Sequence, residues 1–136
     1  MPDHATLKMR SWLFAPGDSE RKMAKAADSA ADIAIFDLED AVAEAQKPAA
    51  RLAVRAMLES QAPAARRRLF VRVNPLDGPH TLADLAAIMP GRPGGIMLPK
   101  ANGRADVERL DHYLSALEAA NGIPVRETKV LVLVTA

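Results

Sequence analysis

The sequence of 136 residues contains no cysteine, which excludes disulfide bonds and thiolate metal sites. Aromatic residues are also scarce, with one Trp, one Tyr and three Phe, which is too few for a nucleic-acid surface built on stacked rings. The 18 basic and 17 acidic side chains nearly balance, so the charge favours neither a nucleic acid nor a membrane surface as a partner.

Long hydrophobic runs are absent as well. No apolar run approaches the roughly 20 residues that cross a bilayer, and residues 1–8 lack the apolar core of a secretory signal. We therefore expect a cytoplasmic protein with one domain over residues 1–136, long enough to bury a sizeable core.

Short apolar runs alternate with amphipathic stretches along the chain. We predict strands at the apolar runs 11–15, 33–36, 69–73, 95–98 and 129–134. We predict helices between them, at 19–29 with Ser19 as the cap, and at 47–62, 81–89 and 104–120. Short connections between alternating strands and helices favour a parallel sheet. In the second helix the spacing predicts a buried face made of Leu52, Val54, Met57 and Leu58.

Three acidic residues follow the second predicted strand, namely Asp37, Glu39 and Asp40. In a parallel sheet all strands end at the same edge, where α/β proteins place their sites. Glu39 and Asp40 suit a hard divalent cation, bound through carboxylate oxygens or through its waters. The same carboxylates are also stabilised at a helix N-terminus, so both interpretations stay open.

Arg72 is the most informative single residue, because it interrupts the apolar strand 69–73. A guanidinium there requires a carboxylate or phosphate partner. The partner is either Glu39 or Asp40 in an internal ion pair, or the carboxylate of a bound substrate. Lys100 follows the fourth strand, where it binds a phosphate, stabilises an enolate, or is simply an exposed loop lysine.

The remaining polar residues give weaker signals. His4, His80 and His112 have no metal-ligand spacing. The arginine run 66–68 favours a solvated rim over a nucleic-acid patch. The chain contains no GxGxxG, P-loop or GxSxG motif.

Four segments together resemble one known family. They are residues 10–18 (RSWLFAPGD), 37–42 (DLEDAV), 71–75 (VRVNP) and 98–100 (LPK). In order and spacing they look like the HpcH/HpaI aldolase and citrate lyase β-subunit-like family. Each segment is weak alone, but four in register make the match specific, and the resemblance covers almost the whole chain from Met9.

The resemblance implies an α/β fold, a TIM barrel of the phosphoenolpyruvate- and pyruvate-utilising kind, of which this chain would form about five N-terminal strands. It implies a carbon–carbon lyase that cleaves or forms a 3-hydroxyacyl-CoA such as malyl-, citramalyl- or citryl-CoA, with Mg²⁺ as the cofactor of full-length relatives. The partners would be an acyl-CoA and a keto acid. A homo-oligomer, trimer or hexamer, is also implied. A divalent cation and an arginine suit this chemistry, because they stabilise developing oxyanions.

The resemblance also assigns roles by position. It makes Arg72, Glu39 and Asp40 the catalytic residues, with Arg72 on the carboxylate of the keto-acid half. Glu39 and Asp40 would support the water shell of the metal. The substrate-binding positions would be Arg72, Phe14, Lys25 and Lys100. Phe14 and Lys25 match positions that approach the CoA end in relatives.

The sequence departs from the family at several places. Ser19 stands where relatives often carry a basic residue, which leaves a CoA phosphate contact there unsupported. The first metal ligand of the family is a glutamate at the end of the fifth strand, where this chain reads Thr135-Ala136 and stops. Either Ala136 occupies that position or the ligand lies beyond it, and the second ligand follows a sixth strand.

Five strands cannot close a barrel that takes roughly 250 residues. We therefore expect an incomplete barrel without a complete metal site, with weak Mg²⁺ binding and little lyase activity. Three alternatives stay open. The chain is a catalytically incompetent fragment, an open flavodoxin-like sheet that serves as a non-catalytic binding module, or a subunit that completes its barrel with another chain.

Overall fold

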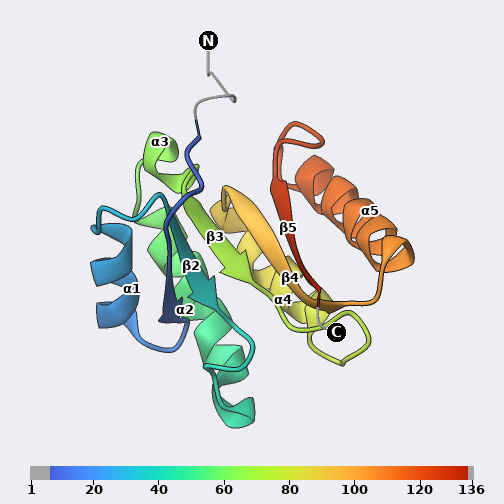
Figure 1. The fold of residues 1–136 in the computed structure, drawn as a ribbon, viewed down its shortest axis with the longest axis horizontal. Coiled ribbons are helices and arrows are strands. Elements are labelled where there is room, and N and C mark those ends of the chain that lie inside the picture. The colour runs from blue at the N-terminus through green and yellow to red at the C-terminus, as the bar shows by residue number, and fades with distance from the viewer. Residues whose placement is uncertain (1–6, 135–136) are drawn as a thin grey trace.

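A computed structural model of the protein describes residues 7–134 (Figure 1). The strands in this range are β1 (Trp12–Pro16), β2 (Ile33–Asp37), β3 (Leu69–Arg72), β4 (Gly95–Ala101) and β5 (Lys129–Val134). The α-helices in the same range are α1 (Glu20–Ala27), α2 (Lys47–Glu59), α3 (Pro63–Arg66), α4 (Thr81–Ile88) and α5 (Arg104–Ala120). Two 3₁₀ helices, η2 (Glu44–Gln46) and η3 (Met89–Gly91), precede α2 and follow α4. The predicted alternation of strands and helices is confirmed.

Local sequence signals set the helix boundaries. The Ser19 hydroxyl accepts the backbone N–H of Lys22 at 3.3 Å and so caps α1. Pro48 lies in the first turn of α2, where its missing N–H removes no helical hydrogen bond. Pro63 starts the separate helix α3, which is why the helix predicted over 47–62 ends earlier than expected.

Within the described residues the strands form one parallel sheet in the order β1-β2-β3-β4-β5. A flavodoxin-like sheet has the order 2-1-3-4-5, so that alternative is wrong. Neighbouring helices pack in the same sequence, α1 on α2, α2 on α4 and α4 on α5, and Figure 1 shows them following one another around the sheet. Right-handed crossovers that always move to the next strand place the helices on one face, as in the wall of a (β/α) barrel.

The larger core lies between the sheet and the helices. Its buried members come from alternate strand positions and from the inner faces of the helices, among them Ala34, Phe36, Val71, Ile96, Met23, Val54, Leu85 and Leu110. The predicted buried face of α2 is confirmed for Val54, Met57 and Leu58 but wrong for Leu52, which is 66% exposed. Residues two apart in a helix point about 200° apart, so Leu52 faces away from Val54.

A smaller core covers part of the other face of the sheet. It consists of Ile33, Ile35, Phe70 and Met97, with Leu7, Met9 and Leu131 packed against it. In a closed barrel this face is the interior, filled by side chains from all strands. Trp12 and Phe14 pair in register with Ile33 and Ile35, yet they are 44% and 46% exposed. The interior face is therefore only partly covered by this chain.

Two arginines of the run 66–68 hold the segments that follow α1 and α2, so the interpretation of this run as a merely solvated rim is wrong. The Arg68 guanidinium donates to the carbonyl oxygens of Ala27 (2.6 Å), Ser29 (3.1 Å) and Ala31 (2.6 Å). Arg66 donates to the carbonyl oxygen of Gln61 at 3.0 Å, just after α2. The carbonyl of Ala27 lies in the last turn of α1, where it has no helical partner, and the other acceptors lie in the segments that follow α1 and α2.

The outer strands leave apolar surface uncovered. Within the described residues β1 and β5 each pair along one edge only, and β5 exposes Val132, Leu133 and Val134. Unpaired edges that carry exposed apolar side chains favour association with another chain. No helix of the described part is both long and apolar enough to cross a membrane.

We expect this chain to associate through these edges as its concentration rises. Val132→Lys places a charge on the edge strand and should lower the average mass measured by sedimentation equilibrium. Leu52→Lys is the matched control, because Leu52 is exposed on α2, away from both edge strands. An average mass that does not fall in Val132→Lys would contradict the prediction.

Candidate functional site

Arg72, at the carboxyl end of β3, pairs side-on with Asp37 at the end of β2. Its Nε and Nη2 atoms donate to the two carboxylate oxygens of Asp37, each at 2.7 Å. The two residues are register partners on adjacent strands, so their side chains leave the sheet on the same face. Glu39 is a weaker partner, 3.6 Å from Arg72 Nη1. The expected internal pair therefore exists, but its main acid is Asp37, which sequence reasoning did not choose.

The Asp37 carboxylate also holds the loop after β2. It accepts the backbone N–H groups of Glu39 and Ala41, both at 2.9 Å. Burial acts to raise the pKa of Asp37, but the hydrogen bonds from Arg72 and from these two N–H groups outweigh it and lower the pKa below its ordinary value. The same side-chain hydrogen bond raises the pKa of Arg72. The pair is therefore charged at neutral pH.

Glu39 lies between two cations. Its carboxylate accepts a hydrogen bond from Lys100 Nζ at 2.8 Å and faces Arg72 on its other oxygen. Glu39 is only 4% exposed, and the two cations compensate its buried charge. The hydrogen bond to Glu39 raises the pKa of Lys100. The Lys100 backbone has a φ of 51°, a left-handed conformation that costs energy for a residue with a Cβ.

Phe14 and Asp40 complete the cluster. The Phe14 ring centre lies 5.1 Å from Arg72 Cζ, a cation–π arrangement. Asp40 is exposed, and its carboxylate lies 3.7 Å from Lys100 Nζ. The structure thus brings together five of the six predicted site residues, Arg72, Glu39, Asp40, Phe14 and Lys100.

The sixth predicted residue, Lys25, lies elsewhere. It is in the last turn of α1, and α1 runs against the strand direction, so this turn is at the amino edge of the sheet. Its place near a CoA end stays a prediction. The helix N-terminus interpretation of Glu39 and Asp40 is wrong, because residues 38–43 form a loop with one turn and no helix begins there.

Lys47, the first residue of α2, is a buried lysine that sequence reasoning missed. Its Nζ donates to the carbonyl oxygens of Leu38 (2.8 Å) and Glu39 (3.0 Å) and to Oδ1 of Asn74 (2.9 Å). These bonds use all three N–H groups of an ammonium. Lys47 therefore supports the backbone that carries Glu39. One feature of the sequence could have predicted its burial. Lys47 lies three residues before Ala50, which is buried on the same face of α2.

A chain of polar contacts extends this support. Asn74 Nδ2 donates to the carbonyl oxygen of Leu38 at 2.9 Å and to Oδ2 of Asp84 at 2.7 Å. The fully buried Asp84 accepts Arg51 Nε at 2.8 Å, and Arg51 Nη2 lies 2.9 Å from His80 Nδ1. Because every member has a partner, this network rigidifies the contact between the loop, α2 and α4.

This edge does not by itself form a magnesium site. Residues 7–134 contain no group of three or more His, Cys, Asp or Glu side chains placed to hold a metal. Asp37 and Glu39 already pair with cations. If Asp40 were the only carboxylate ligand of a Mg²⁺ ion, water would have to fill most of the octahedral coordination shell of the ion. The ligand position expected at 135–136 lies outside the described residues.

Replacing Asp37→Asn should lower the free energy of unfolding by roughly 3 kcal/mol at neutral pH, because it removes the carboxylate partner of the half-buried Arg72. The pKa of Asp37 is lower in the folded chain than in the unfolded chain. Its contribution is therefore full above the unfolded value of about 3.9 and is lost as the pH falls through the folded value.

Urea unfolding measured at neutral pH and near pH 2 checks this prediction. The stability gap between the parent and Asp37→Asn should narrow at the lower pH. Asp28→Asn, at an exposed acid beyond α1, is the control and should leave the pH dependence unchanged. A gap of equal size at both pH values would contradict the assignment.

Replacing Lys47→Met should also cost roughly 3 kcal/mol of unfolding free energy, because buried acceptors lose their donor. The control Lys22→Met removes an exposed lysine from α1 and should be near neutral. Urea unfolding of both variants is the measurement. Equal losses in the two variants would refute the supporting role of Lys47.

The chain matches known proteins over most of its length. A model of the HpcH/HpaI aldolase/citrate lyase family matches residues 10–136. The citrate lyase subunit beta-like protein of Mycobacterium tuberculosis is 42% identical over 113 residues, which are 82% of this chain and 39% of that protein. The (3S)-malyl-CoA thioesterase of Cereibacter sphaeroides is 42% identical over 105 residues, which are 77% of this chain and 36% of that protein. The chain thus spans less than half the length of these relatives.

Solved structures share the fold. The citrate lyase beta subunit from M. tuberculosis, complexed with oxaloacetate and magnesium, has a TM-score of 0.67 and 39% identity, covering 90% of this chain and 46% of that chain. Protein CitE from the same organism, in complex with magnesium and acetoacetate, has a TM-score of 0.70 and 37% identity, covering 95% of this chain and 46% of that chain. The parallel strands therefore correspond to part of a TIM-barrel-type fold. This chain belongs to the HpcH/HpaI aldolase/citrate lyase family.

Proposed function

We propose that this chain carries the keto-acid side of the active site of a carbon–carbon lyase acting on 3-hydroxyacyl-CoA thioesters. The L-malyl-CoA/beta-methylmalyl-CoA lyase of Rhodobacter capsulatus, 38% identical over 118 residues, supports this reaction class. Residues 1–136 would be the N-terminal part of one barrel domain. The remaining strands would come from a longer form of the protein or from another chain.

The observation that carries the proposal is the fixed guanidinium of Arg72. A guanidinium has five N–H donors, and Asp37 occupies two of them side-on. The others lie on Nη1 and Nη2 at the edge of the sheet where family sites form. A guanidinium whose plane is already fixed binds a planar carboxylate with little further loss of freedom. Arg72 would hold the carboxylate of a keto acid such as glyoxylate or pyruvate.

The proposed reaction is a retro-aldol cleavage. The bond between the hydroxyl-bearing carbon and the α-carbon of the thioester breaks, and the hydroxyl passes its proton to a general base and becomes the carbonyl of the keto acid. The bonding electron pair passes to the α-carbon as a thioester enolate, which then takes up a proton. Arg72 orients the leaving keto acid by its carboxylate. Lys100, held by Glu39, supplies positive charge where oxyanions develop.

The proposed partners are a CoA thioester and a keto acid. CitE from M. tuberculosis has been solved with magnesium, acetoacetate and coenzyme A, which supports both. Residues 7–134 do not provide a magnesium ligand set, so no step of the reaction is assigned to the metal. The exposed apolar edges of β1 and β5 support assembly into a homo-oligomer.

One observation favours a second candidate function. Asp37, Glu39, Arg72 and Lys100 neutralise one another in a closed set of ion pairs. A site whose buried charges are internally satisfied fits a non-catalytic binding module or an incompetent fragment, because the two buried carboxylates are already paired with cations. Activity measurements separate the two candidates.

The test is release of glyoxylate or pyruvate from malyl-CoA or citramalyl-CoA in the presence of Mg²⁺. It is run on this chain and on a form extended by the C-terminal half of a relative. Arg72→Lys keeps the charge but loses the planar fork. It should lower kcat/KM about 100-fold, since truncating a buried charged contact removes roughly 2–5 kcal/mol of binding.

Arg55→Lys is the matched control, because Arg55 lies on α2 with its side chain half exposed. Activity in either form that falls in Arg72→Lys and not in Arg55→Lys supports the lyase proposal. No turnover by either form would favour the binding module.

A further inference from the structure

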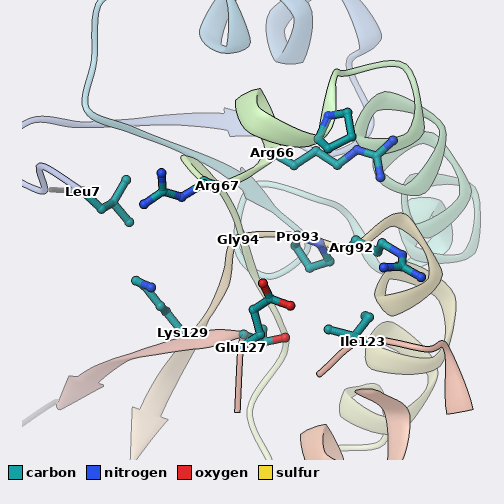
Figure 2. Close-up of a pocket in the computed structure, with 11 residues that line it drawn as sticks. Leu7, Arg66, Arg67, Arg92, Pro93, Gly94, Ile123, Glu127 and Lys129 are labelled. Atoms are coloured by element: carbon teal, nitrogen blue, oxygen red, sulfur yellow. The ribbon is translucent and has the colours of Figure 1, made fainter. Parts of the chain in front are cut away.

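A cavity of about 200 Å³ opens at the amino edge of the sheet, opposite the Arg72 cluster. It lies where the chain enters β3, β4 and β5, as Figure 2 shows. Family active sites form at the carboxyl edge of the strands, so this cavity is separate from the proposed lyase site. Its lining explains what it can bind.

The charged side chains of the cavity are mostly basic. Arg66, Arg67, Arg92 and Lys129 line it, and Glu127 is the acidic residue among its lining residues. They come from three separate segments of the chain, before β3, before β4 and at the start of β5. In Figure 2 the Glu127 carboxylate lies in the middle of the view, between Lys129 and Arg92. Cations from several segments that surround one cavity attract an anion of more than one charge.

Part of each arginine's hydrogen-bonding capacity is used by the protein. Arg66 donates to the carbonyl oxygens of Gln61 at 3.0 Å and Glu59 at 3.5 Å. Arg92 donates to the carbonyl oxygen of Asn121 at 2.9 Å, at the end of α5. Within residues 7–134, neither Arg66 nor Arg92 forms an ion pair with a carboxylate. Since a guanidinium carries five N–H donors, both retain donors and a full charge for a ligand.

The backbone holds the basic segments in place. A Cβ atom on Gly94 would lie 2.2 Å from the carbonyl oxygen of Arg67, so only glycine allows these two segments to touch. The Gly94 N–H donates to the Leu69 carbonyl at 2.8 Å, and the Lys129 N–H donates to the Gly94 carbonyl at 3.1 Å. The cations are therefore mounted on segments tied together by hydrogen bonds, which lowers the entropy cost of binding.

We propose that this cavity binds a small organic polyanion, in which phosphate or carboxylate groups sit on a short carbon skeleton. The charged groups would bond Arg66, Arg92 and Lys129. Leu7, Pro63 and Ile123 provide apolar wall for the carbon skeleton. The negative charge of Glu127 would repel the anionic ligand and so lower its affinity.

The probes are inorganic pyrophosphate for the phosphate class and tricarballylate for the carboxylate class. Each is titrated at constant ionic strength into the ¹⁵N-labelled chain and followed by backbone amide shifts. We expect saturable shifts at Gly94 and Thr128, beside the cavity, from at least one probe. A response to pyrophosphate alone identifies a phosphate ligand, and a response to tricarballylate alone identifies a carboxylate ligand.

Two variants test the assignment in opposite directions. Arg92→Gln should weaken binding about tenfold, the value of one charge-assisted hydrogen bond. Glu127→Gln should tighten it several-fold, a gain that misfolding cannot imitate. The controls Arg21→Gln and Lys22→Gln remove exposed cations of α1 and should leave the affinity unchanged.

Three results would overturn the proposal. These are shifts that a matched amount of KCl reproduces, binding that Lys22→Gln weakens as much as Arg92→Gln, and an affinity that Glu127→Gln leaves unchanged. None of these readouts depends on lyase activity, so this proposal and the proposed function can fail separately.

Discussion

The ion pair between Asp37 and Arg72 is the interaction on which the carboxyl edge depends. It joins β2 to β3 at register neighbours, and the same carboxylate accepts two backbone N–H groups of the following loop. One side chain therefore fixes a guanidinium plane and a loop at once. Because the loop carries Glu39, the position of Lys100 also follows from this pair.

Charge compensation explains why so many ionisable groups tolerate partial burial here. Acids and bases alternate through the cluster, and each charge has an opposite neighbour within 3.6 Å along Asp37, Arg72, Glu39 and Lys100. Behind them, Lys47 meets only neutral acceptors. A buried charge costs several kcal/mol when it is unpaired. The loss of one member therefore destabilises its partner, both in the ion-pair cluster and in the contacts of Lys47.

The sequential strand order has a second consequence. It places the helices on one face and leaves the other face to be covered by further strands of a barrel. This chain covers that face only around Ile33, Ile35, Phe70 and Met97. The exposed Phe14 at the first strand is both part of this uncovered face and a contact of Arg72. Phe14 therefore belongs both to the face that this chain leaves open and to the Arg72 cluster.

Much of the fold was predictable from the sequence, because its signals are local. Short apolar runs predicted the strands, helical apolar spacing predicted the helices, and Ser19 was correctly predicted as a cap. The four family segments pointed to the carboxyl edge and to Arg72, Glu39 and Lys100. The prediction that Leu52 is buried was wrong, because the apolar residues of the second helix do not all lie on the helix face that packs against the sheet.

The sequence by itself determined the elements, the parallel sheet and the family, since each depends on residue types at short spacing. Only the tertiary structure decided that Arg72 bonds Asp37 rather than mainly Glu39 or Asp40, because strand register sets which side chains meet. It also decided that Lys47 is buried beneath the loop, and that arginines before β3 and β4 line one cavity. Those contacts join residues far apart in the chain, and no local pattern records them.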